Sequence, residues 1–220
     1  MYNWLVLGTP SRYLICSGNS SLSDDVYKPP AAELTLESTE QQEQRFYVVS
    51  KLKFTVLYLA TVGLYEVYWF YANWHNYRKV TGEKVLPILR AIFYVFFTHS
   101  LFLKVDAHLK YQEIEFHWRP RWLATLFVIV VVVGNILDRL SVREIGSPLT
   151  DILSLVLLVP ALLIALKAQE AINLGQDDPD GRSNCRFSVY NYLWIALGAA
   201  FWILISAGLL ALFGLLPVDF

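Results

Sequence analysis

The chain alternates long apolar runs with short charged segments. The longest run extends from Phe187 to Val218, 32 residues without a single Lys, Arg, Asp or Glu. As an α-helix this run is longer than the roughly 30 Å hydrocarbon layer of a membrane requires. The pattern therefore predicts an all-α protein that crosses a membrane several times.

Five apolar segments are candidate spans, and they cover residues 54–71, 86–103, 122–137, 152–166 and 189–216. The second is the weakest because Pro87 and Arg90 interrupt it, so it could instead lie along the interface or dip in and return. Pro160 is expected to kink the fourth span. We therefore predict a polytopic transmembrane helical bundle of four or five spans within one domain, residues 46–218.

The first 45 residues differ from the rest in composition. Acidic side chains outnumber Lys and Arg there, and Ser, Gln, Pro and Ala fill much of the remainder. Such a segment buries too little apolar surface to offset the entropy of ordering the chain. We predict a mostly disordered, acidic N-terminal tail over residues 1–45.

Overall composition agrees with a membrane protein, since 55% of the residues are hydrophobic, 17% are charged and the mean hydropathy is +0.42. The formal net charge of -1 implies no nucleic-acid partner. The two cysteines, Cys16 and Cys185, form no C-x-x-C motif and predict free thiols. The sequence implies no cofactor.

The cations near the span ends predict the orientation, because Lys and Arg are retained on the cytoplasmic side. Five spans with the N-terminus inside place ten of these cations inside and five outside. If residues 86–103 lie on the inner surface, the counts become eleven and five. Both arrangements put the loop 167–186 in the cytoplasm and the C-terminus in the periplasm, whereas the side of the tail stays open.

An aromatic run is the most distinctive motif, because seven of the thirteen positions from Tyr65 to Tyr77 are aromatic. This density is typical of a helix end at the headgroup level of a membrane. Residues 63–74 read GLYEVYWFYANW. With the tail segment 26–34 and the polar positions of 168–184, this motif resembles a family of small, uncharacterised bacterial polytopic inner-membrane proteins with a GLYxxYWFYxNW signature. The resemblance covers roughly residues 27–210 and implies a bacterial inner-membrane location, without an activity or a catalytic residue.

Glu66 is the first candidate functional residue. An ionisable group inside a span costs several kcal/mol unless it is paired or hydrated, and such groups often mark ion or substrate paths. A structural interpretation is also open, because Glu66 would lie only about 7 Å below Tyr71 on a continuous helix. There it could reach interfacial water or pair with Arg78 or Arg90.

Four other polar residues are candidates. Asp106 and His108 flank one alanine and could supply two ligands to a metal, but the sequence offers nothing to complete the site, so no metal is predicted. Gln169 and Asn173 stand one helical turn apart. Their amides could bond across to Asn191 and tie the last two spans together, or they could contact a substrate amide.

A stripe of small residues follows one side of the last span. It comprises Ala196, Ala200, Ala207, Ala211 and Gly214, which fall within about 60° of the helix circumference. Small residues allow close backbone approach between helices in membranes. The stripe predicts a packing face, either inside the bundle or in a homodimer.

These observations favour a non-enzymatic membrane protein that has a structural or partner-binding role, with the lipid bilayer and a second copy or another membrane protein as partners. The alternative is a small transporter or channel component that uses Glu66, with Arg90 or Asp106 as companions. An intramembrane enzyme is the third hypothesis, and it would depend on Asp106, His108 and His117 as the only polar cluster.

Overall fold

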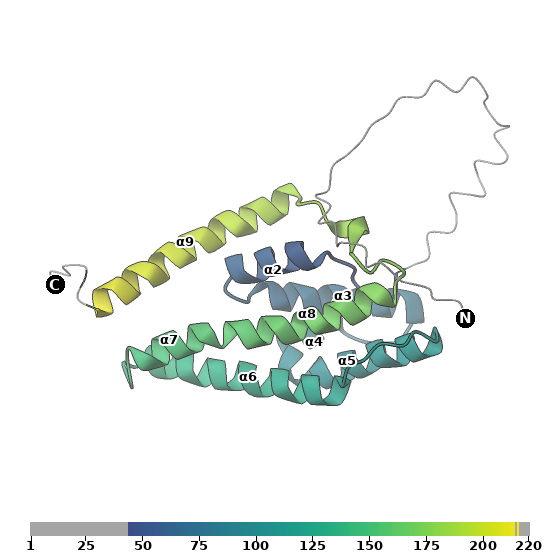
Figure 1. Ribbon diagram of the computed structural model, residues 1–220, viewed down its shortest axis with the longest axis horizontal. Coiled ribbons are helices and arrows are strands. Elements are labelled where there is room, and N and C mark those ends of the chain that lie inside the picture. Colours follow the sequence, from purple (N-terminus) through teal and green to yellow (C-terminus); the bar gives the residue numbers. More distant parts are fainter. Residues whose placement is uncertain (1–43, 214, 216–220) are drawn as a thin grey trace, which may run out of the picture. The chain divides into compact units, whose positions relative to one another are not determined.

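The structure is a computed structural model that describes residues 44–213 and residue 215 (Figure 1). Residues 1–43 of the predicted tail, which include Cys16, and Gly214 lie outside the described residues. Every regular element within this part of the chain is helical, as predicted. The elements are α2 (Lys51–Ala60), α3 (Tyr65–Thr81), α4 (Pro87–Ile92), α5 (Tyr94–Tyr111), α6 (Pro120–Ser141), α7 (Leu149–Val156), α8 (Leu158–Leu174), the short 3-10 helix η1 (Arg182–Asn184) and α9 (Val189–Leu212).

Three helical stretches in the described part are long and apolar enough to cross a membrane. They are Pro120–Ser141, Leu149–Leu174 and Val189–Ala211, which correspond to the third, fourth and fifth candidate spans. The second stretch comprises α7 and α8, which meet at Leu157. Pro160 lies just beyond this junction, and its ring and missing N–H disfavour a hydrogen bond to Val156. The helix is therefore interrupted at Leu157, three residues before Pro160.

The first candidate span, residues 54–71, is not one helix. Helix α2 ends at Ala60, and Val62 and Gly63 then adopt positive φ angles of 52° and 86° that turn the chain. The Thr61 hydroxyl stabilises the turn, since it accepts a hydrogen bond from Tyr65 N at 2.9 Å. Helix α3 then runs back beside α2 (Figure 1). The two helices form a hairpin, which we call the α2–α3 hairpin.

The second candidate span, residues 86–103, is also divided. Helix α4 ends at Ile92, and Phe93 separates it from α5. Large apolar side chains around this junction are exposed, namely Leu86, Ile88, Leu89, Ile92, Phe93 and Phe96. The segment is thus a bent pair of helices with an uncovered apolar surface.

The aromatic run of α3 forms part of the core. Trp69, Phe70 and Trp74 have no exposed surface, whereas Tyr68 is half exposed. Trp69 packs edge-on against Phe70 at 5.0 Å between ring centroids and against Phe54 of α2 at 5.8 Å. The hairpin packs these rings against α2, α5 and α6, so they contact protein, and their position at the headgroup level stays a prediction.

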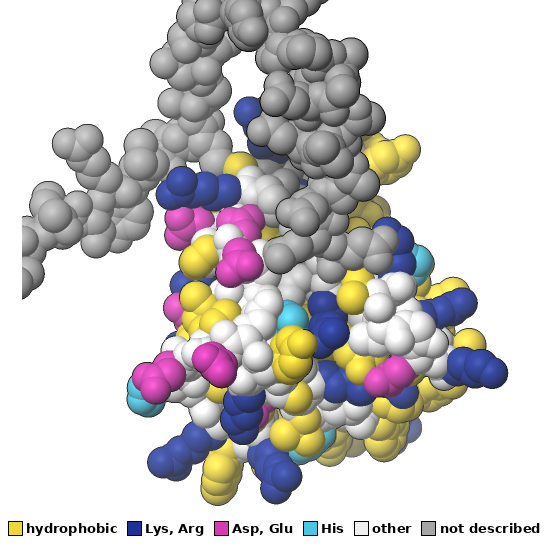
Figure 2. Space-filling model, turned by 90° about the vertical axis from the view of Figure 1, so that its right-hand side faces the viewer, with side chains coloured by type: hydrophobic (Ala, Val, Ile, Leu, Met, Phe, Trp, Pro, Cys, Tyr) yellow, Lys and Arg dark blue, Asp and Glu magenta, His cyan; other side chains and the backbone are white. Residues whose placement is uncertain are grey.

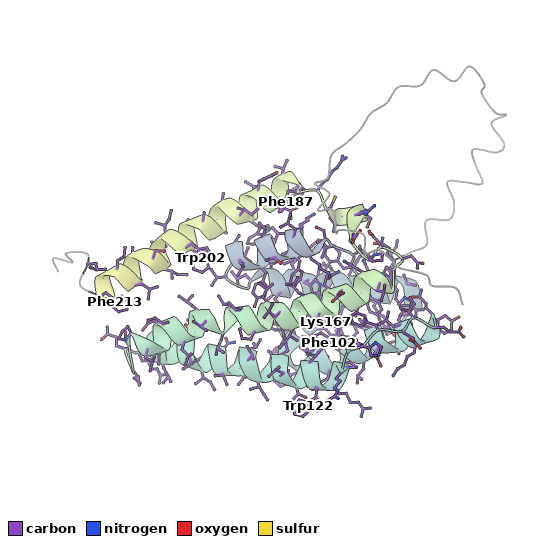
Figure 3. All side chains as sticks on the ribbon, in the orientation of Figure 1. Phe102, Trp122, Lys167, Phe187, Trp202 and Phe213 are labelled. Atoms are coloured by element: carbon purple, nitrogen blue, oxygen red, sulfur yellow. The ribbon has the colours of Figure 1, made fainter. Side chains whose placement is uncertain are left out.

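Helix α9 contacts α2 through Gly198 and Trp202. A Cβ atom on Gly198 would lie 1.8 Å from the Ala60 carbonyl oxygen, so the two backbones are close. Trp202 Nε1 donates a hydrogen bond to the Leu59 carbonyl at 2.7 Å (Figure 3). Only 6% of the apolar window of α9 is buried inside the described part of the chain.

The small-residue stripe of α9 points away from this contact. Ala196 and Ala200 are exposed, and helical geometry puts them with Ala207 and Ala211 roughly opposite Gly198. The stripe therefore does not pack α9 onto the described part of the bundle. Its use in a homodimer stays a prediction.

Charged side chains gather at one end of residues 44–213. Helices α3, α5 and α8 end there and α6 begins there, and Figure 2 shows Lys and Arg side chains spread among acidic and apolar ones. The α6–α7 turn and the C-terminal part of α9 lie at the other end (Figure 1). We call these the charged end and the apolar end.

Candidate functional site

Glu66 lies in the first turn of α3, directly after the hairpin turn, and only 3% of its surface is exposed. Among the described residues, its Oε1 atom has no hydrogen-bond partner. The Tyr94 side chain of α5 lies near the carboxylate. A buried carboxylate with one oxygen that lacks a hydrogen bond costs folding free energy in an apolar environment. Such a group indicates a candidate functional site.

The expected pairing of Glu66 with arginine is wrong for Arg90. The Arg90 guanidinium lies over the Trp74 ring at 4.1 Å and over the Phe97 ring at 5.1 Å. Arg78 is near the opposite end of α3, more than three helical turns from Glu66. The reason is the hairpin, which places Glu66 at its deep end and the arginines toward the charged end.

Glu66 borders a pocket of about 380 Å³. The walls come from the end of α2, the hairpin turn, α5, α6 and the α7–α8 junction, and most of the lining side chains are apolar. The polar side chains in the wall are Tyr58, Glu66, Tyr94, Asn135, Asp138 and Ser154. The lining includes two carboxyl groups and neither Lys nor Arg, so the pocket favours positive charge.

The pocket lies far along α6 from the charged end. Its α6 wall starts at Val130, about 15 Å from Pro120 at 1.5 Å per residue. Because α6 has the length and composition of a membrane span, this depth corresponds to the middle of a bilayer or beyond it. The α2–α3 hairpin thus places a carboxylate level with the middle of the apolar helix α6.

Polar side chains continue from the pocket toward the α6–α7 turn. The Ser141 hydroxyl donates a hydrogen bond to Asp151 Oδ1, and Asp151 Oδ2 is buried without a partner among the described residues. Asp138 and Ser141 stand three residues apart on α6, as Asp151 and Ser154 do on α7, so each pair shares a helix face. The sequence interpretation missed this group, although its three-residue spacing is visible at the edges of the third and fourth candidate spans.

Gln169 and Asn173 do not bond to Asn191. Gln169 accepts a hydrogen bond from Trp69 Nε1 at 2.5 Å and donates to the Tyr47 carbonyl at 3.0 Å. Asn173 Nδ2 donates to the Val49 carbonyl at 2.9 Å, and its Oδ1 accepts from Val49 N at 3.4 Å. The two amides hold the extended segment 45–49 against α8, so their partner is backbone that precedes α2.

Asn191 has a local role instead. Its side chain accepts a hydrogen bond from Ser188 N at 2.9 Å, and the Ser188 hydroxyl accepts one from Asn191 N at 3.4 Å. This reciprocal pair is a capping box at the start of α9. The predicted polar tie between the last two spans is therefore wrong.

Asp106 and His108 do not form a shared site. Asp106 accepts a hydrogen bond from Trp118 Nε1 at 2.9 Å and pairs with Lys110 at 2.8 Å. His108 Nε2 bonds to the Gly175 carbonyl at 2.9 Å, and Arg45 approaches its Nδ1 at 3.3 Å. Burial and the charge of Arg45 lower the pKa of His108 below its usual value. No group of three metal-ligating side chains occurs in the described part of the chain.

Comparison of the chain with protein-family models, with curated protein sequences and with solved structures finds no match.

Proposed function

We propose that the chain is a multi-pass protein of the bacterial inner membrane that acts as a small transporter or channel component, with Glu66 as the site that binds a proton or a small cation. The observation that carries the proposal is the buried, incompletely bonded Glu66 carboxylate on a pocket whose lining has no Lys or Arg. A non-enzymatic structural or partner-binding role is the leading interpretation of the sequence, because the sequence carries no recognisable catalytic motif. In that interpretation Glu66 reaches interfacial water or pairs with Arg78 or Arg90, whereas Arg90 lies over the Trp74 ring.

The proposed topology has three spans. Of the sixteen Lys and Arg side chains in the described part, only Arg139 and Arg143 lie near the apolar end. The other fourteen are Arg45, Lys51, Lys53, Arg78, Lys79, Lys84, Arg90, Lys104, Lys110, Arg119, Arg121, Lys167, Arg182 and Arg186. This bias is stronger than in either arrangement expected from the sequence. It favours a charged end in the cytoplasm, with the loop 167–186 inside and the C-terminus outside.

In this topology α2 to α5 enter from the cytoplasmic side and return to it. The ten residues of α2 extend about 15 Å, half the thickness of the hydrocarbon layer, so the α2–α3 hairpin reaches the bilayer centre without crossing. Backbone reversal at that depth is tolerated where protein surrounds it. Thr61 is buried and Gly63 packs near Leu158, which meets this condition.

The proposed function is tested by ion flux in proteoliposomes. The purified protein is reconstituted with a pH dye inside, an electrical potential is imposed, and proton flux is compared for the unaltered chain, Glu66→Gln and Glu115→Gln. Glu115 is exposed in the loop between α5 and α6, so its variant is the matched control. We expect Glu66→Gln to lower the flux at least about tenfold, equivalent to ~1.4 kcal/mol, and Glu115→Gln to leave it unchanged.

Equal flux in the two variants, or flux no greater than in protein-free liposomes, would favour the structural or partner-binding role. The amount of folded protein per liposome is measured in each case, so that a loss of folding is not mistaken for a loss of transport.

Single cysteines test the topology. In a background lacking Cys16 and Cys185, cysteines introduced at Val80, Ile145 and Asp178 are labelled on intact cells with a membrane-impermeant thiol reagent. Three spans predict labelling at position 145 only, whereas five spans also predict it at position 80. Labelling at position 178 in intact cells would contradict both arrangements.

A further inference from the structure

We propose that the Glu66 pocket binds an organic monovalent cation, an amine with an apolar body, which enters from the apolar end. This inference rests on the proposed function and specifies its ligand. Four features of the pocket support it: its charge, its volume, the composition of its wall and the side on which it is accessible.

The charge of the wall selects a cation. Glu66 and Asp138 both line the pocket, and neither Lys nor Arg does. An anionic ligand would have to approach two carboxyl groups without a compensating positive charge, which is strongly unfavourable at low dielectric. A neutral ligand would leave the Glu66 Oε1 atom without a charged partner.

The volume and the wall select an organic cation over a metal ion. A pocket of about 380 Å³ has the volume of about a dozen waters at ~30 Å³ each, far more than a bare ion fills. Divalent metal ions need about six closely placed oxygen ligands. Here the oxygens are separated by apolar side chains such as Val67, Val131 and Leu158. This wall suits a molecule with an apolar body and one charged group.

Aromatic rings add a second means of holding an ammonium group. Tyr58 and Tyr94 both line the pocket, and Tyr94 also lies near the Glu66 carboxylate. Tyrosine rings attract organic ammonium ions through their electron-rich faces. The ammonium group would thus lie near Glu66 and the tyrosines, with its apolar body against α6 and the α7–α8 junction.

The pocket is closed toward the charged end and open elsewhere, since Leu64 and Val67 of the hairpin also line it and are exposed. Toward the apolar end, Asn135 and Asp138 are exposed at the edge of the pocket. Toward the charged end, the fully buried rings of Trp69, Phe70 and Phe127 fill the space between the helices. In the proposed topology the ligand therefore enters from the periplasmic side and meets Asp138 before Glu66.

Binding of phenethylamine and of its neutral analogue, phenylethyl alcohol, to the detergent-solubilised full chain tests the proposal by titration calorimetry. We expect saturable binding of phenethylamine. Glu66→Gln should weaken it at least about tenfold, and Asp138→Asn about threefold because that carboxylate is solvated. Phenylethyl alcohol should bind at least tenfold more weakly than the amine. Glu115→Gln should bind the amine normally.

Equal binding of the amine and the alcohol, or amine binding that Glu66→Gln leaves unaltered, would overturn the inference. So would the absence of saturable amine binding to the folded chain. Proton flux that depends on Glu66 in the same preparation would then still support the proposed function, so the two failures are distinguishable. The route of entry is tested with Asn135→Cys and a thiol reagent. We expect phenethylamine to slow labelling from the outside. Labelling from the cytoplasmic side alone would contradict the proposed route.

Discussion

The charged end and the apolar end of the chain are organised by different forces. At the charged end, buried polar groups such as Lys53, Asn73 and Gln169 have hydrogen-bond partners, and wide aromatic rings fill the core. At the apolar end, α9 exposes most of its large apolar side chains. The charged end is stabilised by internal packing, as in a water-soluble protein, whereas the apolar end depends on lipid to cover its surface.

The largest loss of stability is expected when hydrogen bonds of the charged end are removed. Asn173→Ala removes the donor and the acceptor that serve the buried backbone of Val49. Unsatisfied buried groups cost ~1–3 kcal/mol each, so we expect the free energy of unfolding to fall by about 3 kcal/mol. Denaturant unfolding of the solubilised protein measures this loss. Gln112→Ala, at an exposed position at the end of α5, is the control and should cost less than about 0.5 kcal/mol. Similar losses for both variants would contradict the claim that internal hydrogen bonds stabilise the charged end.

Two glycines on α9 test how this helix packs on α2. Gly198→Ala forces a methyl group against the Ala60 carbonyl, and overpacking of this kind costs about 1–3 kcal/mol. Gly208→Ala meets no atom within 4 Å and should not destabilise the protein. Thermal unfolding in detergent compares the two. If both variants unfold like the unaltered chain, α9 does not pack on α2 as described.

The smallest effect concerns pH at the charged end. The pKa of His108 is lowered by burial and by Arg45, so the folded chain favours the neutral ring. The unfolded chain takes up a proton first as the pH falls through about 6.5, and stability should decrease from there down to the lower pKa of the folded state. Melting temperatures between pH 8 and pH 5 should show this decrease, and His108→Gln should reduce it. A slope unaffected by the substitution would exclude His108 as its source.

The sequence predicted the helical class and the three apolar helices well, because each contains a run of 15 or more residues without Lys, Arg, Asp or Glu, and such runs have few alternatives to a buried or membrane helix. It did not predict the α2–α3 hairpin. Val62 and Gly63 reverse the chain inside an apolar run that contains no proline, and the turn is stabilised by Thr61 and by packing near Leu158. The contact of Gly63 with Leu158 is distant in sequence, so it leaves no local signal.

The same limitation explains why the surroundings of the candidate functional residues could not be predicted from the sequence. Glu66 stands out in the sequence because a carboxylate in an apolar run is unusual, but the sequence does not show that a chain reversal directly precedes it. The partners of Gln169 and Asn173 were missed because hydrogen bonds to backbone depend on where segment 45–49 passes, and its residue types do not specify that path. Small residues on α9 likewise predicted a packing face, while the contact with α2 uses the opposite side through Gly198.

The walls of the Glu66 pocket have a consequence for biogenesis. Glu66 is synthesised long before Asn135 and Ser154, which complete its surroundings. A nascent chain that has reached only α5 has the hairpin carboxylate without the helices that enclose it. The pocket is therefore completed late, when α7 and α8 join α6. A chain truncated before Leu149 should lack the pocket even though every residue of the hairpin is present.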